Sequence, residues 1–374
     1  MKFVVSSSSL SSHLQVISRV IASKNTISIL DCFLFELQGN ILKITAADSE
    51  TRMITSVEVQ EVEGEGVFAI PSKNMLDSLK ELPDQPIIFD IDDTTLEMLI
   101  LYENGKYNFI GQNGDEYPQP KPLKDNANKI EISAESLFSG ISRTLFATAE
   151  DELRPVMNGI FFDILDTETT FVASDGHKLV RFKNFSIKGN EKAAFILPKK
   201  PANLLKTVLP RETGVVTIGF DDNNAYFTME HVVIISRLIE GRYPNYNGVI
   251  PKDNPFKLTV DRLLIVNALK RVTVFSNPSS SLIKLQLFPD SIFISAQDID
   301  YSTSAEETVP CVYEGDEISI GFKGTYLIEI LSNIPSTEVV LQLADPSRAG
   351  LMLPAENEPD EDLLMLLMPM MLND

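Results

Sequence analysis

Hydrophobic residues recur three or four positions apart in six windows of the chain, with polar residues between them. Leu10, Leu14, Ile17 and Ile21 form one such series. This spacing gives each window one apolar side and predicts amphipathic helices. Ser133 and Thr259 are the expected N-caps of the windows that begin next to them. The six expected helices cover residues 10–22, 72–82, 134–146, 199–209, 260–271 and 323–333.

Short segments rich in Ile, Phe and Val lie between these windows, and turn-forming pairs such as Gly39-Asn40 and Pro289-Asp290 separate them. This composition predicts β-strands joined in hairpins. Runs of strands with only two short helices beside them are typical of an α+β domain with antiparallel sheets and helices on one face. The clearest strand segments are 32–37, 41–46, 159–164, 170–173, 282–288 and 292–296.

Two landmarks repeat along the chain at the same intervals. Asp48, Asp175 and Asp298 each follow a strand-like run, and they lie 127 and 123 residues apart. A second landmark recurs at the same intervals of 127 and 123 residues. Because two landmarks share these intervals, we interpret the chain as three copies of one domain. This second landmark opens a helical window each time, at Pro71, Pro198 and Gly321. Proline-containing linkers at 117–122 and 243–248 separate the expected domains, which are 1–122, 123–250 and 251–374.

The chain has 374 residues, enough for three domains that each bury a core. Its longest apolar run, residues 363–372, is about half the ~20 residues that a membrane-spanning helix needs. The first residues lack the apolar core of a secretory signal, so we expect a cytoplasmic protein without a membrane partner. Cys32 and Cys311 have no CxxC spacing, which favours reduced, buried thiols over a disulfide or zinc site.

The net charge of −21 disfavours binding to a polyanion unless positive charge is concentrated somewhere. The six helical windows hold eleven Lys and Arg residues against five Asp and Glu residues, a net charge of +6, so the remainder carries −27. This segregation indicates a shared helical face that tolerates a phosphate backbone without reading its sequence. The alternative is that lysine is simply a good helix former on solvated faces.

The sequence offers no motif for catalysis or cofactor binding. Asp175-Gly176-His177 is typical of a turn between two strands rather than of a catalytic or metal-binding histidine. The three histidines occupy unrelated positions in the repeats, and neither a GxSxG elbow nor a GxxxxGK[ST] loop occurs. We therefore expect no catalytic residue, no cofactor and no metal ion, and a protein that is not an enzyme.

Five further motifs occur in order and in register with the three copies. They are RPVMNG (154–159), ASDGHKL (173–179), EGRYPNY (240–246), FSN (275–277) and MPMML (368–372). Together they resemble the bacterial sliding clamp family, the β subunit of DNA polymerase III, and the resemblance covers all 374 residues. It implies a ring-forming clamp fold in which two copies join head to tail around duplex DNA, with helices on the inner face and sheets outside.

The resemblance also implies partners. The ring would contact double-stranded DNA independently of sequence, and it would bind the replicative DNA polymerase and the clamp loader through short linear peptides. Four lysines match basic positions that the family uses near DNA: Lys24, Lys73, Lys199 and Lys200. At the junction between two copies of the chain, the apolar contact matches Phe109, Val274 and Phe275. The flanking acidic strip matches Asp298, Asp300, Glu306 and Glu307, and Lys106 is a candidate for the opposite charge.

The peptide-binding groove of the family lies between the second and third copies. Methionine and leucine side chains give such a groove an apolar lining that adapts to several peptides. The residues that match it are Arg154, Met157, Ser174, Gly176, His177, Lys178, Leu179, Pro244, Val249, Met368, Pro369 and Met370.

Two classes of function remain open. The first is a non-enzymatic processivity factor that encircles DNA. The second is a ring or arc scaffold that binds only proteins, for which negative charge is no obstacle. Retention on circular but not on linearised DNA distinguishes them, because only an encircling protein is released when the DNA is cut. A third class, a small-molecule hydrolase, needs a cleft that the sequence does not indicate.

Overall fold

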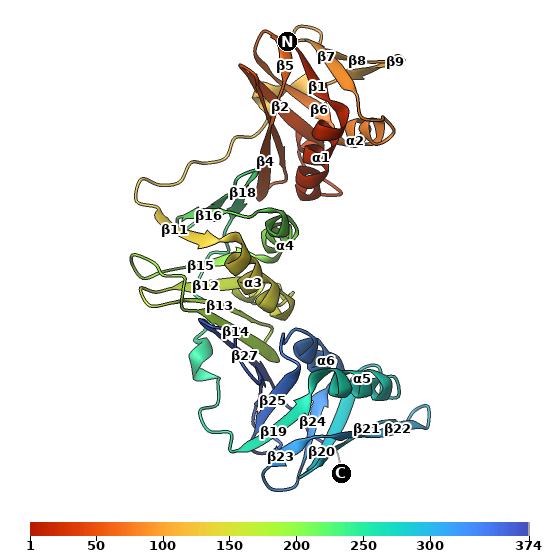
Figure 1. Cartoon of the computed structure of the whole chain (residues 1–374), viewed down its shortest axis with the longest axis vertical. Coiled ribbons are helices and arrows are strands. Elements are labelled where there is room, and N and C mark those ends of the chain that lie inside the picture. Colours follow the sequence, from red (N-terminus) through yellow and green to blue (C-terminus); the bar gives the residue numbers. More distant parts are fainter. Residues whose placement is uncertain (373–374) are drawn as a thin grey trace. The chain divides into compact units, whose positions relative to one another are not determined.

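The computed structural model describes residues 1–372 and divides the chain into two compact units. Unit 1 comprises residues 1–138 and 200–238, and unit 2 comprises residues 139–199 and the described residues from 239 onward. Both units contain antiparallel sheets and short helices (Figure 1). The chain passes between the units three times, within α3 (Ala134–Thr144), within α4 (Lys199–Val208) and after residue 238.

Unit 1 is built on two antiparallel sheets. The five-stranded sheet has the order β5 (Gln60–Glu63), β1 (Lys2–Ser6), β7 (Pro86–Asp92), β8 (Glu97–Tyr102) and β9 (Gly105–Ile110). The nine-stranded sheet has the order β10 (Gln112–Asn113), β6 (Gly66–Pro71), β2 (Cys32–Gln38), β3 (Ile41–Ala47), β4 (Thr51–Glu58), β18 (Val232–Arg237), β17 (Asn224–Thr228), β16 (Val215–Phe220) and β11 (Asn128–Ser133). The β4–β18 pair therefore carries one sheet from the first expected domain into the second.

Unit 2 repeats this plan with a second strand join. Its nine-stranded sheet has the order β15 (Ala193–Pro198), β12 (Gly159–Ile164), β13 (Thr169–Ser174), β14 (Lys178–Asn184), β27 (Glu361–Leu367), β26 (Gly350–Pro354), β25 (Glu338–Leu343), β19 (Phe256–Asp261) and β23 (Val312–Glu314). The four-stranded sheet has the order β22 (Thr303–Pro310), β21 (Ser291–Asp298), β20 (Leu282–Phe288) and β24 (Ile318–Lys323). Here the β14–β27 pair joins the second expected domain to the third.

A helix forms in each predicted window, but the first begins three residues earlier and ends five residues earlier than the expected 10–22, so Ile21 lies outside it. In α1 (Ser7–Ile17) the fully buried residues are Leu10, Leu14 and Ile17, and Ser6 Oγ accepts a hydrogen bond from Ser9 N at 3.2 Å to cap the first turn. Helix α1 packs beside α2 (Ser72–Lys80), and α5 (Arg262–Thr273) packs beside α6 (Gly324–Ser332). Short 3-10 helices are η1 (Ser18–Val20), η2 (Ser28–Asp31), η3 (Gly114–Glu116), η4 (Leu145–Ala147), η5 (Pro155–Met157), η6 (Leu209–Arg211) and η7 (Tyr246–Gly248).

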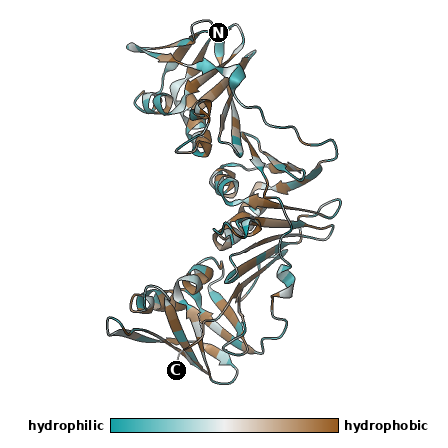
Figure 2. Ribbon diagram, turned by 180° about the vertical axis from the view of Figure 1, so that it is seen from behind, coloured by the Kyte–Doolittle hydropathy of each residue, from teal (hydrophilic) through white to brown (hydrophobic). Residues whose placement is uncertain are grey.

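Aromatic and aliphatic side chains of the strands form the cores. Figure 2 shows hydrophobic residues along the strands and on the helices, and hydrophilic residues in many of the loops. In unit 1 the rings of Phe3 and Phe89 stack with centroids 4.7 Å apart, and in unit 2 those of Phe162 and Phe195 stack at 4.4 Å. Each buried side chain of this size contributes ~1.5–3 kcal/mol to stability, so packing rather than helix propensity holds the short helices in place.

One of the two expected N-caps is confirmed and the other is wrong. Ser133 Oγ accepts from Ser136 N at 3.1 Å at the start of α3. Thr259 instead belongs to β19, and Asp261 caps α5 by accepting from Leu264 N at 2.8 Å. Strand pairing continues through Asp261, the residue directly before the helix, so the cap lies two positions after Thr259.

The third landmark, Gly321, does not open a helix as Pro71 and Pro198 do. Strand β24 continues through Gly321 to Lys323, and α6 begins at Gly324. Gly321 pairs with β20 on one side of β24. On the other side its carbonyl oxygen accepts a hydrogen bond from Met370 N at 2.8 Å, so partners on both edges hold the backbone extended. Strand β24 has six residues, as β6 and β15 have, so the third landmark lies two positions further from the end of its strand than Pro71 and Pro198 do.

Both cysteines are free thiols, and the expectation of burial is confirmed only for Cys32, because Cys311 is partly exposed. Burial raises the pKa of each thiol to about 11, and Asp31 and Asp290 add to the effect at Cys32 and Cys311 respectively. The thiolate is the reactive form, so a raised pKa leaves little of either group reactive near neutral pH.

Slow thiol modification of the folded protein is therefore expected. At pH 8 a thiol with a pKa near 11 is on the order of a hundredfold less ionised than a free cysteine, and both cysteines should react with a disulfide reagent that much more slowly than in denaturant. Timed absorbance with and without guanidinium measures this. Equal rates in the two conditions would contradict the shielding of both groups.

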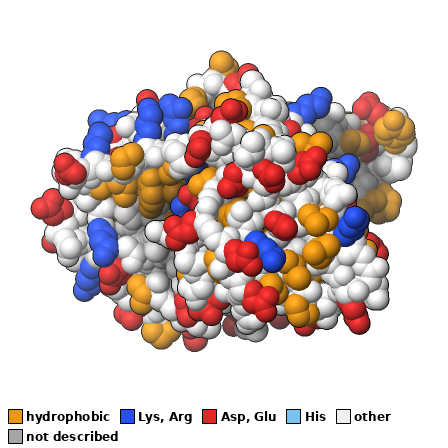
Figure 3. Space-filling view, turned by 90° about the horizontal axis from the view of Figure 1, so that it is seen from above, with side chains coloured by type: hydrophobic (Ala, Val, Ile, Leu, Met, Phe, Trp, Pro, Cys, Tyr) orange, Lys and Arg blue, Asp and Glu red, His pale blue; other side chains and the backbone are white. Residues whose placement is uncertain are grey.

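Acidic residues outnumber basic ones by 53 to 32, which gives the net charge of −21. The face in Figure 3 has acidic side chains spread across it, while several basic side chains gather toward one edge. Among residues 1–372, no helix is both long enough and apolar enough to cross a membrane.

Candidate functional site

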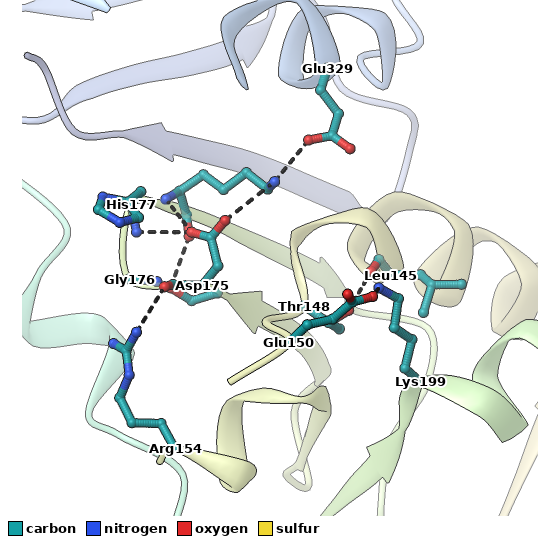
Figure 4. Close-up of polar contacts among 11 residues, drawn as sticks. Leu145, Thr148, Glu150, Arg154, Asp175, Gly176, His177, Lys199 and Glu329 are labelled. Atoms are coloured by element: carbon teal, nitrogen blue, oxygen red, sulfur yellow. Dashed lines mark hydrogen bonds and ion pairs between the residues drawn. The ribbon is translucent and has the colours of Figure 1, made fainter. Parts of the chain in front are cut away.

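The turn between β13 and β14 is fixed by its own residues (Figure 4). Asp175 Oδ1 accepts hydrogen bonds from the backbone N–H groups of His177 and Lys178, each at 2.9 Å. Gly176 has a φ of +92°, and a Cβ at this position would lie 2.8 Å from Arg154 Nη1. The turn therefore requires glycine, and it leaves His177 exposed at its tip.

Charged side chains hold the turn from two sides (Figure 4). Arg154 donates to the backbone oxygen of Asp175 at 3.4 Å and to Asp151 Oδ2 at 2.8 Å. Lys178 Nζ lies 2.8 Å from Glu329 Oε2 and 3.3 Å from Asp175 Oδ2. Burial opposes the charge of Lys178, but the hydrogen bond to Glu329 and the field of Asp175 outweigh it, so the pKa of this ammonium is raised. Lys178 was expected to line the groove, but its side chain is buried and already paired.

An apolar cluster lies directly behind this turn. Leu179, the residue after Lys178, is 4% exposed within it, and the ring of Phe161 stacks on Tyr243 at 4.8 Å. Tyr246 donates to Asp163 Oδ2 at 2.8 Å, which ties the 243–248 segment to β12. The buried members of the cluster are Val172, Leu179, Ile196, Tyr243, Tyr246, Ala349, Leu351, Leu364 and Leu366.

The C-terminal segment runs past the same turn. Met368 N donates to His177 O at 2.8 Å, and the Met368 side chain is 43% exposed. Val249 is 59% exposed, and Pro244 is exposed as well. We name the apolar surface of Pro244, Val249, Met368 and Met370, which lies over the buried Leu179, the β14–β27 surface. Met157 and Ser174, also expected in the groove, are each only 8% exposed and so support it from beneath.

The four expected DNA-facing lysines differ in their surroundings. Lys24 and Lys73 are exposed, and no carboxylate among residues 1–372 lies within 4.0 Å of either ammonium. Lys199 and Lys200 each form an ion pair, and Lys200 Nζ also donates to the backbone oxygen of Val20 at 2.7 Å. The carboxylate partners are Glu150 and Asp48 respectively. The two neighbouring lysines thus carry partly compensated charges.

Each of the four sheets in the described chain has two outermost strands, and β9 in unit 1 and β22 in unit 2 are two of these eight. Phe109 on β9 is half-buried, and its ring lies 6.4 Å from that of Tyr107. Val274 and Phe275 follow α5 and are 77% and 40% exposed. The expected junction residues therefore lie beside free strand edges, which are templates for pairing with another chain.

One cluster was not expected from the sequence. Ligand atoms of Glu212, Glu230 and His231 lie within 4.8 Å of one another in unit 1. Glu230 and His231 are exposed, and exposed acidic groups commonly gather without an ion, so this arrangement alone assigns no metal. The support that Glu329 gives Lys178 was also missed, because the two residues are 151 positions apart and no local pattern connects them.

Three family models match the chain in succession. They describe the N-terminal, central and C-terminal domains of the DNA polymerase III beta subunit and match residues 1–121, 131–245 and 247–371. The chain belongs to the DNA polymerase III beta subunit family. The α+β fold with three clamp domains is thereby confirmed for this beta-subunit chain.

Individual relatives of the beta-subunit family match all or nearly all of the chain. A protein named beta sliding clamp from Pseudomonas putida is 26% identical over 375 residues and covers 100% of both chains. Another beta sliding clamp, from Synechococcus elongatus, is 27% identical over 353 residues and 92% of each chain. The crystal structure of a Pseudomonas aeruginosa sliding clamp bound to griselimycin matches with a TM-score of 0.94 at 25% identity and 100% coverage of both chains.

The repeat that the sequence predicted is visible in the turns of this beta-subunit chain. The first hairpin turn has Asp48 Oδ1 accepting from Glu50 N at 2.8 Å, and the third has Asp298 Oδ1 accepting from Asp300 N at 3.0 Å. The second is the Asp175 turn of the β14–β27 surface. The same residue type thus closes the same turn in each copy.

Proposed function

We propose that the chain is a non-enzymatic DNA polymerase processivity factor. Two copies close head to tail into a ring that encircles duplex DNA and slides along it, and the ring tethers the replicative polymerase through a short peptide. Support comes from the three family matches and from relatives named beta sliding clamp over the whole chain. Topology rather than tight binding would retain the ring, so weak phosphate contacts suffice.

The pattern of strand joins is the observation that carries the ring. The last strand of the second copy, β18, pairs with β4 of the first, and the last strand of the third copy, β27, pairs with β14 of the second. In the first copy, β9 is the third strand after the second helix and so is the counterpart of β18 and β27. In the third copy, β22 is the counterpart of β4 and β14, and both β9 and β22 are edge strands. A second copy of the chain supplies the missing partner for each edge, which gives two identical seams.

The internal joins also give a register for the seam. Arg52 faces Ile235 in one join, and Leu179 faces Leu366 in the other. The hairpin pairings show which residues occupy the same positions at the two free edges. Ser304 on β22 is the counterpart of Arg52 on β4, and Asn108 on β9 is the counterpart of Ile235 on β18. The same register puts Glu306 opposite Lys106 of the second copy. Both side chains are exposed, so each is available for an intermolecular ion pair.

A charge exchange tests this register. Lys106→Glu or Glu306→Lys places like charges opposite each other, which costs about 1 kcal/mol per seam and weakens a two-seam dimer roughly 30-fold. The double variant restores the opposite charges and should recover most of the affinity. Sedimentation equilibrium measures all three. Failure of the double variant to recover would mean that these positions do not face each other.

DNA contact is proposed for the basic residues on the helices and beside them. The helical windows carry a net +6 in a chain of −21, which supports a cationic face toward the duplex. Lys24 and Lys73 are the better test residues, because glutamate at Lys199 or Lys200 would be repelled by Glu150 or Asp48 as well as by DNA. The protein-only scaffold is the competing proposal, and release on linearising a circular DNA separates the two.

Lys24→Glu combined with Lys73→Glu is expected to lower clamp loading on DNA several-fold, and more strongly at low salt, because screening weakens phosphate contacts at high salt. Loading onto nicked plasmid in the presence of the clamp loader measures it. The matched control is Lys188→Glu with Lys252→Glu, which makes the same charge change at exposed positions outside the helices. Equal losses in both pairs would show that net charge alone is responsible.

Peptide docking is proposed at the β14–β27 surface, together with the neighbouring Arg154, Gly176, His177 and Pro369. Exposed methionine over a buried leucine and tyrosine floor supports this, since such side chains adapt to several apolar peptides. The clamp loader and the polymerase would use the same surface in turn.

We further propose the domain boundaries 1–122, 123–250 and 251–374. The family matches to 1–121, 131–245 and 247–371 support them. The two compact units are divided differently because each nine-stranded sheet runs across a boundary. Residues 373 and 374 of the third domain lie outside the described residues.

A further inference from the structure

The turn of the β14–β27 surface has a close counterpart in unit 1. There Asp48 Oδ1 accepts from Glu50 N at 2.8 Å and from Thr51 N at 2.6 Å, and Arg237 N donates to Glu50 O at 2.8 Å. In unit 2 the corresponding bonds join Asp175 to His177 N and Met368 N to His177 O. The backbone that carries the proposed peptide site is therefore built twice in one chain.

A hollow of about 480 Å³ lies beside this second turn, entirely within unit 1. The repeat assigns each residue around the β4–β18 join a counterpart around the β14–β27 join. The two residues of such a pair are 127 positions apart in the hairpin, 126 in the linker and 131 in the last strand. Eight of the twelve residues assigned to the peptide site have a counterpart that lines the hollow. In the hairpin and the segment before it, Leu30 corresponds to Met157, Glu50 to His177 and Arg52 to Leu179. In the linker Pro118 corresponds to Pro244, and in the last strand Arg237 corresponds to Met368.

The lining of the hollow differs from its counterpart in one decisive way. Arg52 replaces the buried Leu179, and Arg237 replaces Met368. Lys121 adds a third positive charge from the linker. The β14–β27 surface is suited to an apolar side chain, whereas this hollow is suited to a negatively charged one.

Arg52 is the key residue because it is only 7% exposed. Its guanidinium donates to Pro118 O and lies 5.6 Å from the ring centroid of Tyr117, but no carboxylate among residues 1–372 is within 4.0 Å of it. Burial lowers the pKa of this group, as expected for a cation removed from water without a direct counter-ion. A buried guanidinium with unused N–H donors is matched by a planar carboxylate, which it binds through two parallel hydrogen bonds.

We propose that this hollow is a second peptide-docking site, selective for a linear peptide that carries an acidic side chain. The proposal rests on the peptide-docking function of its counterpart. The two acids at the rim, Asp48 and Glu50, are engaged by Lys200 and by Arg237 at 3.8 Å. They still repel the continuous negative charge of a nucleic acid, which favours a peptide with one or two carboxylates. One chain would thus hold two partners of different chemistry at once.

The test uses the full-length chain and two fluorescein-labelled hexapeptides. One alternates leucine with aspartate, and in the other asparagine replaces aspartate. Fluorescence anisotropy should give at least tenfold tighter binding of the acidic peptide. Arg52→Leu, which installs the residue found in the counterpart, should remove this preference, and Arg52→Lys should leave part of it, because lysine keeps the charge but not the paired donors. No preference in the unaltered protein would overturn the proposal.

Three further arms keep the result decisive. Arg237→Met changes an exposed side chain and should weaken the acidic peptide several-fold, even if Arg52→Leu fails to fold. A chain truncated after Leu367 should keep the preference. If the truncated chain lost the preference for the acidic peptide, the peptide would bind at the β14–β27 surface. That result would overturn the second docking site but not the first. Displacement by millimolar phosphate but not by acetate would identify a phosphate site and overturn the peptide assignment.

Discussion

Val274→Asp combined with Phe275→Asp is expected to yield a folded monomer that does not stay on circular DNA. Both side chains are already exposed in the single chain, at 77% and 40%, so the change costs the fold little. In the ring each would be buried in two seams, and each lost apolar contact removes ~1.5–3 kcal/mol. Four such losses, with four charges buried in their place, exceed what a dimer of ordinary affinity can tolerate.

Light scattering after size exclusion measures the mass, and retention on nicked circular DNA measures encirclement. Val215→Asp is the matched control, since it places the same charge on a 59% exposed valine at the start of β16, away from the proposed seam. The control should remain a dimer. A double variant that still forms dimers would remove these residues from the junction and would leave the ring without its apolar contact.

Met368→Asp combined with Val249→Asp is expected to abolish peptide docking while the ring stays closed. The pair places two charges over the floor of Leu179 and Tyr243, and an apolar peptide side chain cannot cover them without desolvation. The loss should be at least 100-fold in affinity for a labelled peptide from the cognate replicative polymerase, because two apolar contacts are replaced by buried charges.

Anisotropy titration measures this affinity, and the mass of the dimer serves as the check on folding. Met371→Asp is the control, as Met371 is 77% exposed in the same segment but lies outside the proposed surface. It should bind the peptide normally. If both variants lost affinity equally, the terminal segment would act through its overall charge rather than through the β14–β27 surface.

The fold was largely predictable because its signals are local and repeated. The spacing of Leu10, Leu14 and Ile17 predicted a helix whose buried side is formed by these residues. Thr259 and Gly321 misled the prediction, since each belongs to a strand whose pairing partner is far away in the sequence. Local propensity cannot reveal such a partner, and strand pairing overrides it.

The sites were less predictable than the fold, for a related reason. Residue types such as Met368 and Val249 could be assigned by family resemblance, and their exposure agrees with a surface role. The partners of Lys178, Lys199 and Lys200 could not, because Glu329, Glu150 and Asp48 are 151, 49 and 152 positions away. Whether a lysine is a free charge or a structural one depends on such distant carboxylates.

The strand pairs that join the copies also determine which interface of the ring separates first. The β4–β18 and β14–β27 joins are each bridged by a covalent linker and backed by a buried tyrosine, Tyr117 in one and Tyr243 in the other. The seam between two chains would use the same kind of strand pairing with neither reinforcement. A force that opens the ring would therefore separate the two chains at a seam and leave the joins within each chain intact. A clamp loader could then open the ring by mechanical force alone, and the seam could close again without assistance.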